Sequence, residues 1–233
     1  MALARSLLYA ALFYSVTFLW VLAAIVASLF GRALTLGVVM SWVEVHHWLA
    51  ENILGIRVAV EGAIPPGPHL IAVKHQSMFE TIEMVRISHL PVMVMKRELD
   101  RIPLFGLVTR RYGTIVVERS AGAKALRALV AEGKQAVASG RAVIIYPEGT
   151  RVRVGETPPL KSGFTALYRA LGLPVVPVAM DSGVLWGRGL VHRPGVITFR
   201  VGETIPAGLA REELESRVHT AINALESAPQ ASA

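Results

Sequence analysis

The chain has 233 residues, 53% of them hydrophobic, with a mean hydropathy of +0.48 and a formal net charge of +7, which fits one α/β domain attracted to anionic lipid and phosphorylated substrates. Its 24 Lys and Arg residues are scattered and form no recognised nucleic-acid motif, so we expect no nucleic-acid partner. The absence of Cys excludes disulfides, thiolate zinc sites and a cysteine-bound acyl intermediate.

The N-terminal segment is a candidate membrane anchor. Between Arg5 and Arg32 no charged residue interrupts residues 6–30. As a helix this run would be roughly 38 Å long, enough to cross a bilayer. It exceeds the apolar core of a signal peptide, which is about 7–15 residues, and no clear small-x-small cleavage site ends it. We therefore expect the segment to be retained.

A second apolar stretch, residues 33–50, is interrupted by Glu44, His46 and His47. This pattern is typical of an interfacial or packed helix rather than a second span. Adjacent histidines on a helix point about 100° apart, and no Cys or acidic cluster joins them, so we interpret the pair as interfacial polar residues and not as metal ligands. Residues 1–54 are predicted to form a membrane-anchoring helical segment, and whether it crosses or dips into the bilayer stays open.

Beyond residue 55, short apolar runs alternate with helical patterns. The expected strands are 56–60, 70–73, 91–95, 114–117, 142–146, 174–179 and 196–201, and the expected helices are 78–89, 121–138, 161–171 and 210–225. This alternation predicts an α/β fold with a mixed, largely parallel sheet flanked by helices. We assign residues 55–226 to this domain and expect a disordered tail at 227–233.

A histidine precedes a carboxylate by five residues at the first strand-to-helix junction: His75 and Glu80. On one regular helix these positions would lie about 140° apart, so direct contact requires His75 to precede the helix. The apolar strand 70–73 and Ser77 as a helix cap support that position. An acid that holds one imidazole nitrogen leaves the other to take a proton from a substrate hydroxyl, which predicts a general base.

The same residues have a structural alternative. Ser77 and Glu80 have the S-x-x-E spacing of a capping box, in which the Glu80 carboxylate would accept a hydrogen bond from the Ser77 amide. The local sequence alone does not distinguish this role from the catalytic one.

A polar loop, Tyr-Pro-Glu-Gly-Thr-Arg at 146–151, follows the apolar run 142–145. Loops at strand ends carry function in α/β folds. The alternative is a Pro-Glu-Gly turn in which Arg151 is merely solvated.

With two further segments, these patterns resemble the membrane-bound glycerolipid acyltransferases, in particular the bacterial 1-acyl-glycerol-3-phosphate acyltransferases. Four blocks occur in that family's order and cover most of the chain after residue 55. They are His75 to Glu80; Lys96-Arg97-Glu98-Leu99 with Pro103, Gly106, Gly113 and Glu118-Arg119; Tyr146 to Arg151; and Val175-Val176-Pro177-Val178. Glu80 and Glu118 stand where the family more often has Asp, a change that keeps the carboxylate and bears mainly on loop geometry.

The resemblance implies a membrane enzyme of phospholipid biosynthesis. It would transfer an acyl chain from acyl-coenzyme A or acyl carrier protein to the sn-2 hydroxyl of 1-acyl-glycerol-3-phosphate, giving phosphatidic acid, with no cofactor and no metal. Residues 55–226 would form the acyltransferase domain. The expected location is the bacterial inner membrane, with this domain on the cytoplasmic side.

The resemblance also implies roles for particular residues. His75 would be the base and Glu80 the acid that orients it. The remaining candidates would bind substrate: Arg119 and Arg151 the phosphate, Lys96 as a weaker third cation, and Glu148, Gly149 and Thr150 the rest of the acceptor. Glu148 would brace its loop or bind acceptor hydroxyls. Backbone amides near Gly149 or at the helix start after His75 are candidate donors to the oxyanion.

Two alternatives remain. In the first, the enzyme acylates another lysolipid, such as a lyso-ornithine lipid, although the arginines favour an acceptor with a phosphate group. A non-catalytic membrane lipid-binding protein would keep the fold and the phosphate site without turnover. The presence of both His75 and Glu80 favours catalysis.

Overall fold

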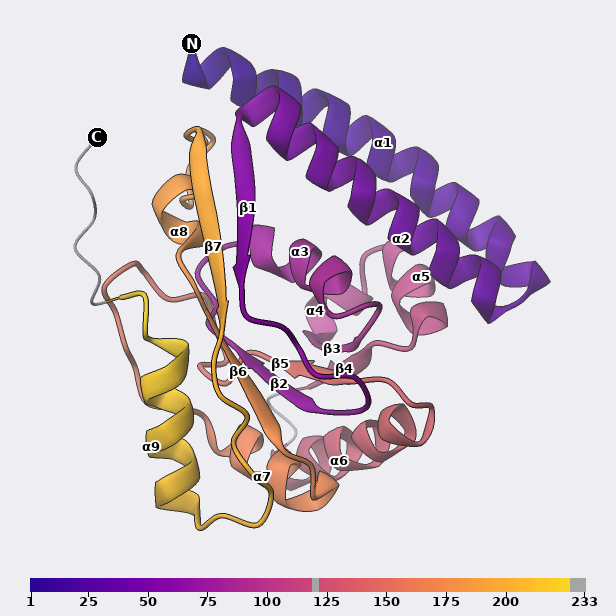
Figure 1. Cartoon of the computed structure of the whole chain (residues 1–233). Helices are drawn as coiled ribbons and strands as arrows, with labels where there is room; N and C mark the ends of the chain where they lie inside the picture. Colours follow the sequence, from indigo (N-terminus) through magenta and orange to yellow (C-terminus); the bar gives the residue numbers. More distant parts are fainter. Residues whose placement is uncertain (119–121, 227–233) are drawn as a thin grey trace.

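A seven-stranded mixed sheet, in the order β1-β7-β6-β2-β5-β3-β4, forms the centre of the structure (Figure 1). Its strands are β1 (Ile56–Glu61), β2 (Leu70–Val73), β3 (Val92–Lys96), β4 (Ile115–Val117), β5 (Val143–Ile145), β6 (Val175–Met180) and β7 (Gly195–Val201). Neighbouring strands run parallel except β6 and β7, which are antiparallel. This computed structural model describes residues 1–118 and 122–226, so Arg119 and the predicted tail 227–233 lie outside the described residues.

Beyond residue 55 the sequence predicted all seven strands and four of the helices, with ends that differ by up to three residues. These helices are α3 (Phe79–Ile87), α6 (Gly122–Ala138), α7 (Ser162–Leu171) and α9 (Arg211–Ile222). It did not predict α4 (Arg97–Asp100), α5 (Phe105–Tyr112) or α8 (Ser182–Leu185). Each of these three has eight residues or fewer, too short for the apolar repeat of a helix to be read.

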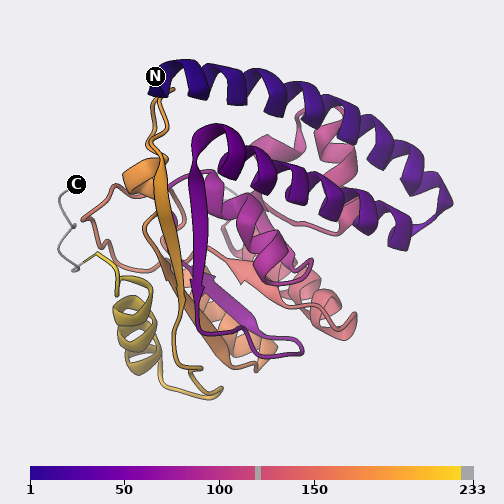
Figure 2. The same ribbon diagram turned by 45° about the horizontal axis from the view of Figure 1, so that its top comes forward.

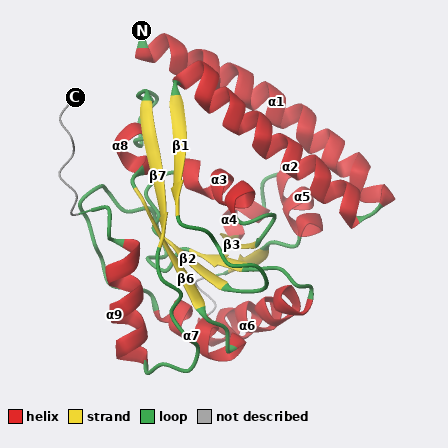
Figure 3. Cartoon of the chain, viewed as in Figure 1, coloured by secondary structure: helices red, strands yellow, loops and turns green. Residues whose placement is uncertain are grey.

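The central strands bury both of their faces, because helices cover the sheet on both sides (Figures 2 and 3). Alternate residues of β2 point to opposite faces. Ile71 and Val73 pack in a core with α2 (Arg32–Leu49) and α3, whereas Leu70 and Ala72 pack in a second core with α6, α7 and α9. All four side chains are 0% exposed, which explains why this strand has a continuous apolar sequence.

Two long helices, α1 (Ala2–Phe30) and α2 (Arg32–Leu49), form an N-terminal hairpin that a π-helical segment, Ala50–Leu54, connects to β1. In the part of the chain that the structure describes, α1 alone is long and apolar enough to cross a membrane, with a mean hydropathy of 2.2 and 17% of that stretch buried. The hairpin lies beside α3 and α5 (Figure 1). Arg5 Nε fixes its base by donating a hydrogen bond to Ile53 O at 2.5 Å.

The predicted interfacial position of the histidine pair is wrong for His46. This side chain is 1% exposed, because the face of α2 that carries it packs on α3. Its ring lies among four aromatic rings, those of Tyr9, Phe13, Phe79 and Trp186. His47 Nδ1 lies 3.1 Å from Glu83 Oε1 on α3. The pair therefore joins the hairpin to the helix that follows His75.

Gly106 in α5 gives a test of the packing between α4 and α5. A Cβ at this position would lie 1.8 Å from the carbonyl oxygen of Asp100, which is too close for any real contact. We expect Gly106→Ala to lower the free energy of unfolding by at least about 1–3 kcal/mol, because the backbone must shift to make room. Denaturant unfolding in detergent micelles measures this change.

The matched control is Gly163→Ala in α7, where nothing lies within 4 Å of the added Cβ. This substitution should stabilise the protein by roughly 0.5–1 kcal/mol, since Ala favours a helix more than Gly does. Equal stabilities for the two variants would contradict the close approach of Gly106 to Asp100.

Candidate active site

The candidate site lies where β2, β5 and β6 end. His75 follows β2, the 146–151 loop follows β5, and Ser182 follows β6. Because β2 pairs in parallel with both β5 and β6, the three carboxyl ends meet at one edge of the sheet. This is the edge at which parallel α/β sheets bind ligands.

His75 and Glu80 form a direct pair, with Nδ1 of the imidazole 2.8 Å from Oε1 of the carboxylate. The predicted position of His75 ahead of the helix is confirmed, since α3 begins at Phe79. The His75 side chain is 17% exposed and that of Glu80 is 0% exposed. With Nδ1 engaged by the acid, Nε2 is the ring atom that remains to face a substrate.

Glu80 also caps the start of α3, so the two roles considered for it coexist. Its Oε1 accepts hydrogen bonds from the backbone amides of Gln76, at 2.8 Å, and Ser77, at 2.7 Å. The second of these is the capping-box contact. Its Oε2 accepts from the hydroxyls of Ser77, at 2.6 Å, and Ser182, at 2.7 Å. Each carboxylate oxygen is thus held by at least two donors, and together these donors come from the ends of β2 and β6.

These donors keep the buried carboxylate charged. Burial by itself would raise the pKa of Glu80, but the hydrogen bonds from His75, Ser77 and Ser182 outweigh it, and the pKa lies below its ordinary value. A charged Glu80 fixes the tautomer of His75, because the Nδ1 that faces it must carry the proton. The ring of Tyr146 stacks on the imidazole at a centroid distance of 4.2 Å and further restrains its orientation.

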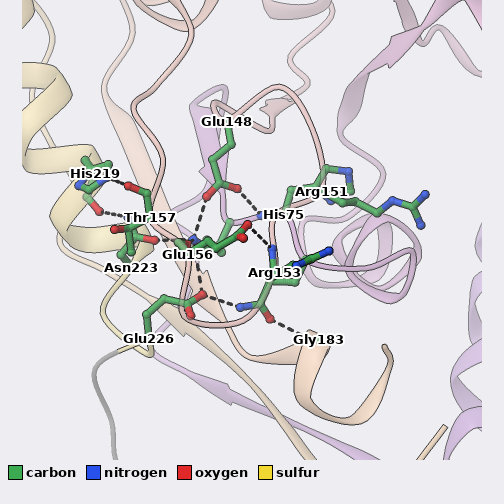
Figure 4. Close-up of polar contacts among 12 residues, drawn as sticks. His75, Glu148, Arg151, Arg153, Glu156, Thr157, Gly183, His219, Asn223 and Glu226 are labelled. Atoms are coloured by element: carbon green, nitrogen blue, oxygen red, sulfur yellow. Dashed lines mark hydrogen bonds and ion pairs between the residues drawn. The ribbon is translucent and has the colours of Figure 1, made fainter. Parts of the chain in front are cut away.

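Glu148 contacts His75 through the backbone. Its Oε2 accepts a hydrogen bond from the His75 amide at 3.0 Å, and its Oε1 lies 2.8 Å from the ammonium nitrogen of Lys74 (Figure 4). Glu148 is 2% exposed. Burial raises the pKa of this carboxyl, and Lys74 offsets part of that rise. These contacts agree with the role of a brace for the loop, one of the two roles expected for Glu148.

Of the other candidates in this loop, Gly149 is half-buried, whereas Thr150 and Arg151 lie at the surface. Gly149 adopts the left-handed conformation, with φ 72°, and donates its amide hydrogen to Tyr146 O at 2.9 Å, closing the turn. Thr150 and Arg151 are exposed. In Figure 4 the side chain of Arg151 points away from Glu148 and Glu156. A guanidinium in this position can reach a ligand outside the protein surface.

The second block is described only in part. Lys96 is exposed at the end of β3. Glu118 Oε2 lies 3.2 Å from Arg97 Nε and 4.0 Å from a terminal guanidinium nitrogen of Arg101. It therefore pairs with two of the cations near Lys96. Arg119, the expected phosphate ligand next to Glu118, lies outside the described residues.

Two residues of this site were not among the predicted candidates. Ser182 donates to Glu80 and is 0% exposed, and Lys74 pairs with Glu148 and is 0% exposed. The available signal was their position, since each lies within two residues of the end of a buried strand at the edge where the motifs meet. Sequence alone does not tell which polar residues at such an edge point inward.

Comparison with known proteins gives matches over most of the chain. The family model described as Acyltransferase matches residues 55–181. The chain is 35% identical to a 1-acyl-sn-glycerol-3-phosphate acyltransferase of Pseudomonas aeruginosa over 208 residues, which cover 87% of this chain and 81% of that protein. It is 30% identical to the human 1-acyl-sn-glycerol-3-phosphate acyltransferase alpha over 72% of this chain and 59% of that protein.

A solved structure is similar over nearly the whole length. The crystal structure of a 1-acyl-sn-glycerophosphate acyltransferase from Thermotoga maritima superposes with a TM-score of 0.79 and covers 97% of this chain and 96% of that one. At 20% sequence identity this likeness concerns the fold. It extends to the N-terminal hairpin as well as the sheet.

The lowered pKa of Glu80 predicts how Glu80→Gln will respond to pH. A carboxyl whose pKa is depressed by folding contributes stability above its unfolded pKa, about 4.3, and loses it as the pH falls through the folded value. The variant should therefore have its largest deficit in unfolding free energy at about pH 7, and the deficit should shrink below about pH 4.3. Denaturant unfolding of both proteins across this range measures it.

Glu213→Gln is the control, because Glu213 is 47% exposed and pairs with Arg217 within α9. It should cause little change at any pH, as exposed ion pairs contribute little. A Glu80→Gln deficit that does not vary with pH would mean that Glu80 is not stabilised as a carboxylate.

Proposed function

This chain belongs to the acyltransferase family, and we propose that it acylates the sn-2 hydroxyl of 1-acyl-glycerol-3-phosphate, using acyl-coenzyme A or acyl carrier protein as donor and giving phosphatidic acid. The named activity of the Pseudomonas aeruginosa and human relatives supports this acceptor. The observation that carries the chemistry is the contact of His75 with a buried, ionised carboxylate.

In the proposed reaction His75 acts as general base. Its Nε2 takes the proton of the acceptor hydroxyl as that oxygen attacks the thioester carbonyl carbon. The C–O bond forms, the tetrahedral intermediate expels the thiolate, and the imidazolium returns its proton to the departing sulfur. Atoms and charge balance with no protein-bound acyl group. Glu80 stabilises the imidazolium and keeps the ring oriented through its 2.8 Å contact with Nδ1.

Four backbone amides in the two segments expected to donate to the oxyanion have partners within the protein. The amides of Gln76 and Ser77, at the start of the helical segment, already donate to Glu80, and the Gly149 amide donates to Tyr146 O. The amide of Phe79 donates to Ser77 Oγ at 3.0 Å. Because each of these four amides has an internal partner, we propose that the oxyanion binds to another donor, and the expectation that a backbone amide of one of these two segments supplies it stays a prediction.

Arg151 is our proposed ligand for the acceptor phosphate, with Arg119 as the second cation and Lys96 as the third. The exposure of Arg151 and its place in the loop braced by Glu148 support this role. A guanidinium is suited to it because it binds phosphate through two parallel N–H···O bonds. Thr150, also exposed, is proposed to contact the same acceptor.

The hairpin gives the domain a surface for lipid. Exposed apolar side chains of α1 include those of Leu8, Phe18, Leu19 and Phe30. We propose that residues 1–54 anchor the protein and that residues 55–226 form the acyltransferase domain, on the cytoplasmic side of a bacterial inner membrane. An acceptor held in that membrane would reach the site without leaving the lipid phase.

His75→Ala should abolish turnover while leaving lipid binding intact. Loss of a general base costs about 10²–10⁴-fold in rate. The assay is release of free thiol from acyl-coenzyme A, or transfer from acyl carrier protein, with the product identified by mass. The acceptors are 1-acyl-glycerol-3-phosphate and a panel of other lysolipids that includes lyso-ornithine lipid.

The control is His69→Ala, because His69 is a half-buried histidine just before β2 whose Nδ1 lies 3.1 Å from Gly67 O. Its activity should match that of the wild type. If product forms with another lysolipid but not with 1-acyl-glycerol-3-phosphate, that lysolipid is the acceptor and the proposed one is wrong. No product from any donor and acceptor, with vesicle binding retained, would favour a lipid-binding role.

Arg151→Ala should raise KM for the acceptor. A hydrogen bond to a charged group contributes about 1.5–3 kcal/mol, so we expect an increase of about 10- to 150-fold with a smaller effect on KM for acyl-coenzyme A. Arg153→Ala is the matched control, since Arg153 is an exposed cation two residues further along. Equal changes in KM for the two variants would indicate general attraction by charge instead of a phosphate site at Arg151.

A further inference from the structure

The residue before the proposed base carries a buried positive charge. The Lys74 side chain is 0% exposed, directly after the end of β2. Lysine is almost never fully buried unless it is paired, because its ammonium group loses water there. Such a group beside His75 calls for a reason that ordinary core packing does not supply.

All three ammonium hydrogens of Lys74 have acceptors within reach. Its Nζ lies 2.8 Å from Glu148 Oε1, 2.6 Å from Glu156 O and 2.6 Å from Asn223 Oδ1. Glu226 Oε1 is a fourth oxygen at 3.4 Å. Figure 4 shows the dashed lines of Glu148, Glu156, Asn223 and Glu226 meeting beside His75. One side chain thus joins the loop after β5 to the end of α9.

The segment that Lys74 holds is also the segment that fixes the backbone of His75. Glu148 Oε2 accepts the amide hydrogen of His75 at 3.0 Å. On the other side, the carbonyl of His75 accepts a hydrogen bond from the Val152 amide at 2.8 Å. The amide and the carbonyl of His75 are therefore both held by residues of one loop. Lys74 binds this loop at Glu148 and at Glu156.

Gln76, on the other side of His75, reaches the same part of the chain. Its Nε2 donates to Glu226 Oε1 at 2.5 Å, and its Oε1 accepts from the Gly183 amide at 2.8 Å. Glu226 Oε2 in turn accepts from the Gly155 amide at 2.5 Å. The residues that flank His75 are thus both tied to Glu226, just after α9.

We propose that Lys74 is a positioning residue for the catalytic histidine. It binds the 148–156 loop and the end of α9, and through Glu148 it sets the backbone position of His75. Its charge also balances the buried Glu148 carboxylate, which would otherwise have no reason to stay ionised in this environment. This inference rests on the proposed general-base role of His75.

A purely structural role makes a different prediction. If Lys74 only attaches α9 to the domain, any loss of that attachment should have the same effect on activity. His219 offers the comparison: its Nε2 lies 3.0 Å from Thr157 O, so it links α9 to the same loop one residue beyond Glu156. His219→Ala weakens this link and leaves the Lys74–Glu148–His75 contacts in place.

The experiment compares Lys74→Met with His219→Ala in the full-length protein in detergent. Misplacement of a catalytic group by about 1 Å can cost 100-fold, so we expect kcat of Lys74→Met to fall by about 100-fold. KM for the acceptor should change by less than about threefold, because the cation proposed to bind phosphate, Arg151, remains. His219→Ala should keep kcat within about twofold of the wild type.

Lys74→Gln covers the case in which Lys74→Met does not fold. It keeps hydrogen-bond donors and loses the charge, and we expect the same selective fall in kcat. A folded Lys74→Met or Lys74→Gln protein with wild-type kcat would overturn the positioning role and leave the acyltransfer proposal intact. A fall in kcat of His219→Ala as large as that of the Lys74 variant would also overturn the positioning role. A wild-type protein inactive with every donor and acceptor would overturn the acyltransfer proposal itself, and this inference with it.

Discussion

A carboxylate buried without water must find donors inside the protein, and the Glu80 carboxylate finds them at two strand ends. It accepts hydrogen bonds from the amides of Gln76 and Ser77 after β2, and from the Ser182 hydroxyl after β6. These contacts require β2 and β6 to lie side by side and in register. In the sheet, Val73 of β2 is paired with Val178 of β6. The parallel core of the sheet thus brings together the donors that keep Glu80 charged, and Glu80 in turn orients His75.

The site contains a second buried charge cluster, which acts on the backbone rather than the ring of His75. Lys74 and Glu148 lie 2.8 Å apart with both side chains 0% exposed. A buried ion pair adds little net stability, because desolvation opposes the attraction, although removal of one partner is costly. Its value here is geometric. Glu80 fixes the orientation of the imidazole, whereas Glu148 and Lys74 fix the position of the residue, and the proposed general base depends on both.

Much of this arrangement follows from local sequence. The strands were predictable because buried parallel strands are short apolar runs, and the pairing of His75 with Glu80 followed from a spacing that places the histidine ahead of a helix. The contacts of Lys74 and Ser182 could not be predicted from local sequence. The partners of Lys74 lie 74 to 152 residues away, and Glu80 lies 102 residues from Ser182, so they meet only in the folded sheet. The position of His46 was mispredicted because a polar residue in an apolar helix suggests the membrane–water interface. Only the fold shows that the acid Glu83 lies beside it in the interior.

Glu83 explains how the N-terminal hairpin and the site are joined. It lies on α3 one turn after Glu80, is 0% exposed, and contacts His47 of α2 at 3.1 Å and Arg86 at 3.0 Å. Burial would raise the pKa of Glu83, but His46, His47 and Arg86 together lower it to about 2, so it is charged at any ordinary pH. The first turn of α3 is therefore fixed by the hydrogen bonds of Glu80, and the next turn is fixed by the contacts of Glu83 with the hairpin. Because a nine-residue helix is rigid over one turn, the N-terminal hairpin and the proposed base hold a fixed relation to each other.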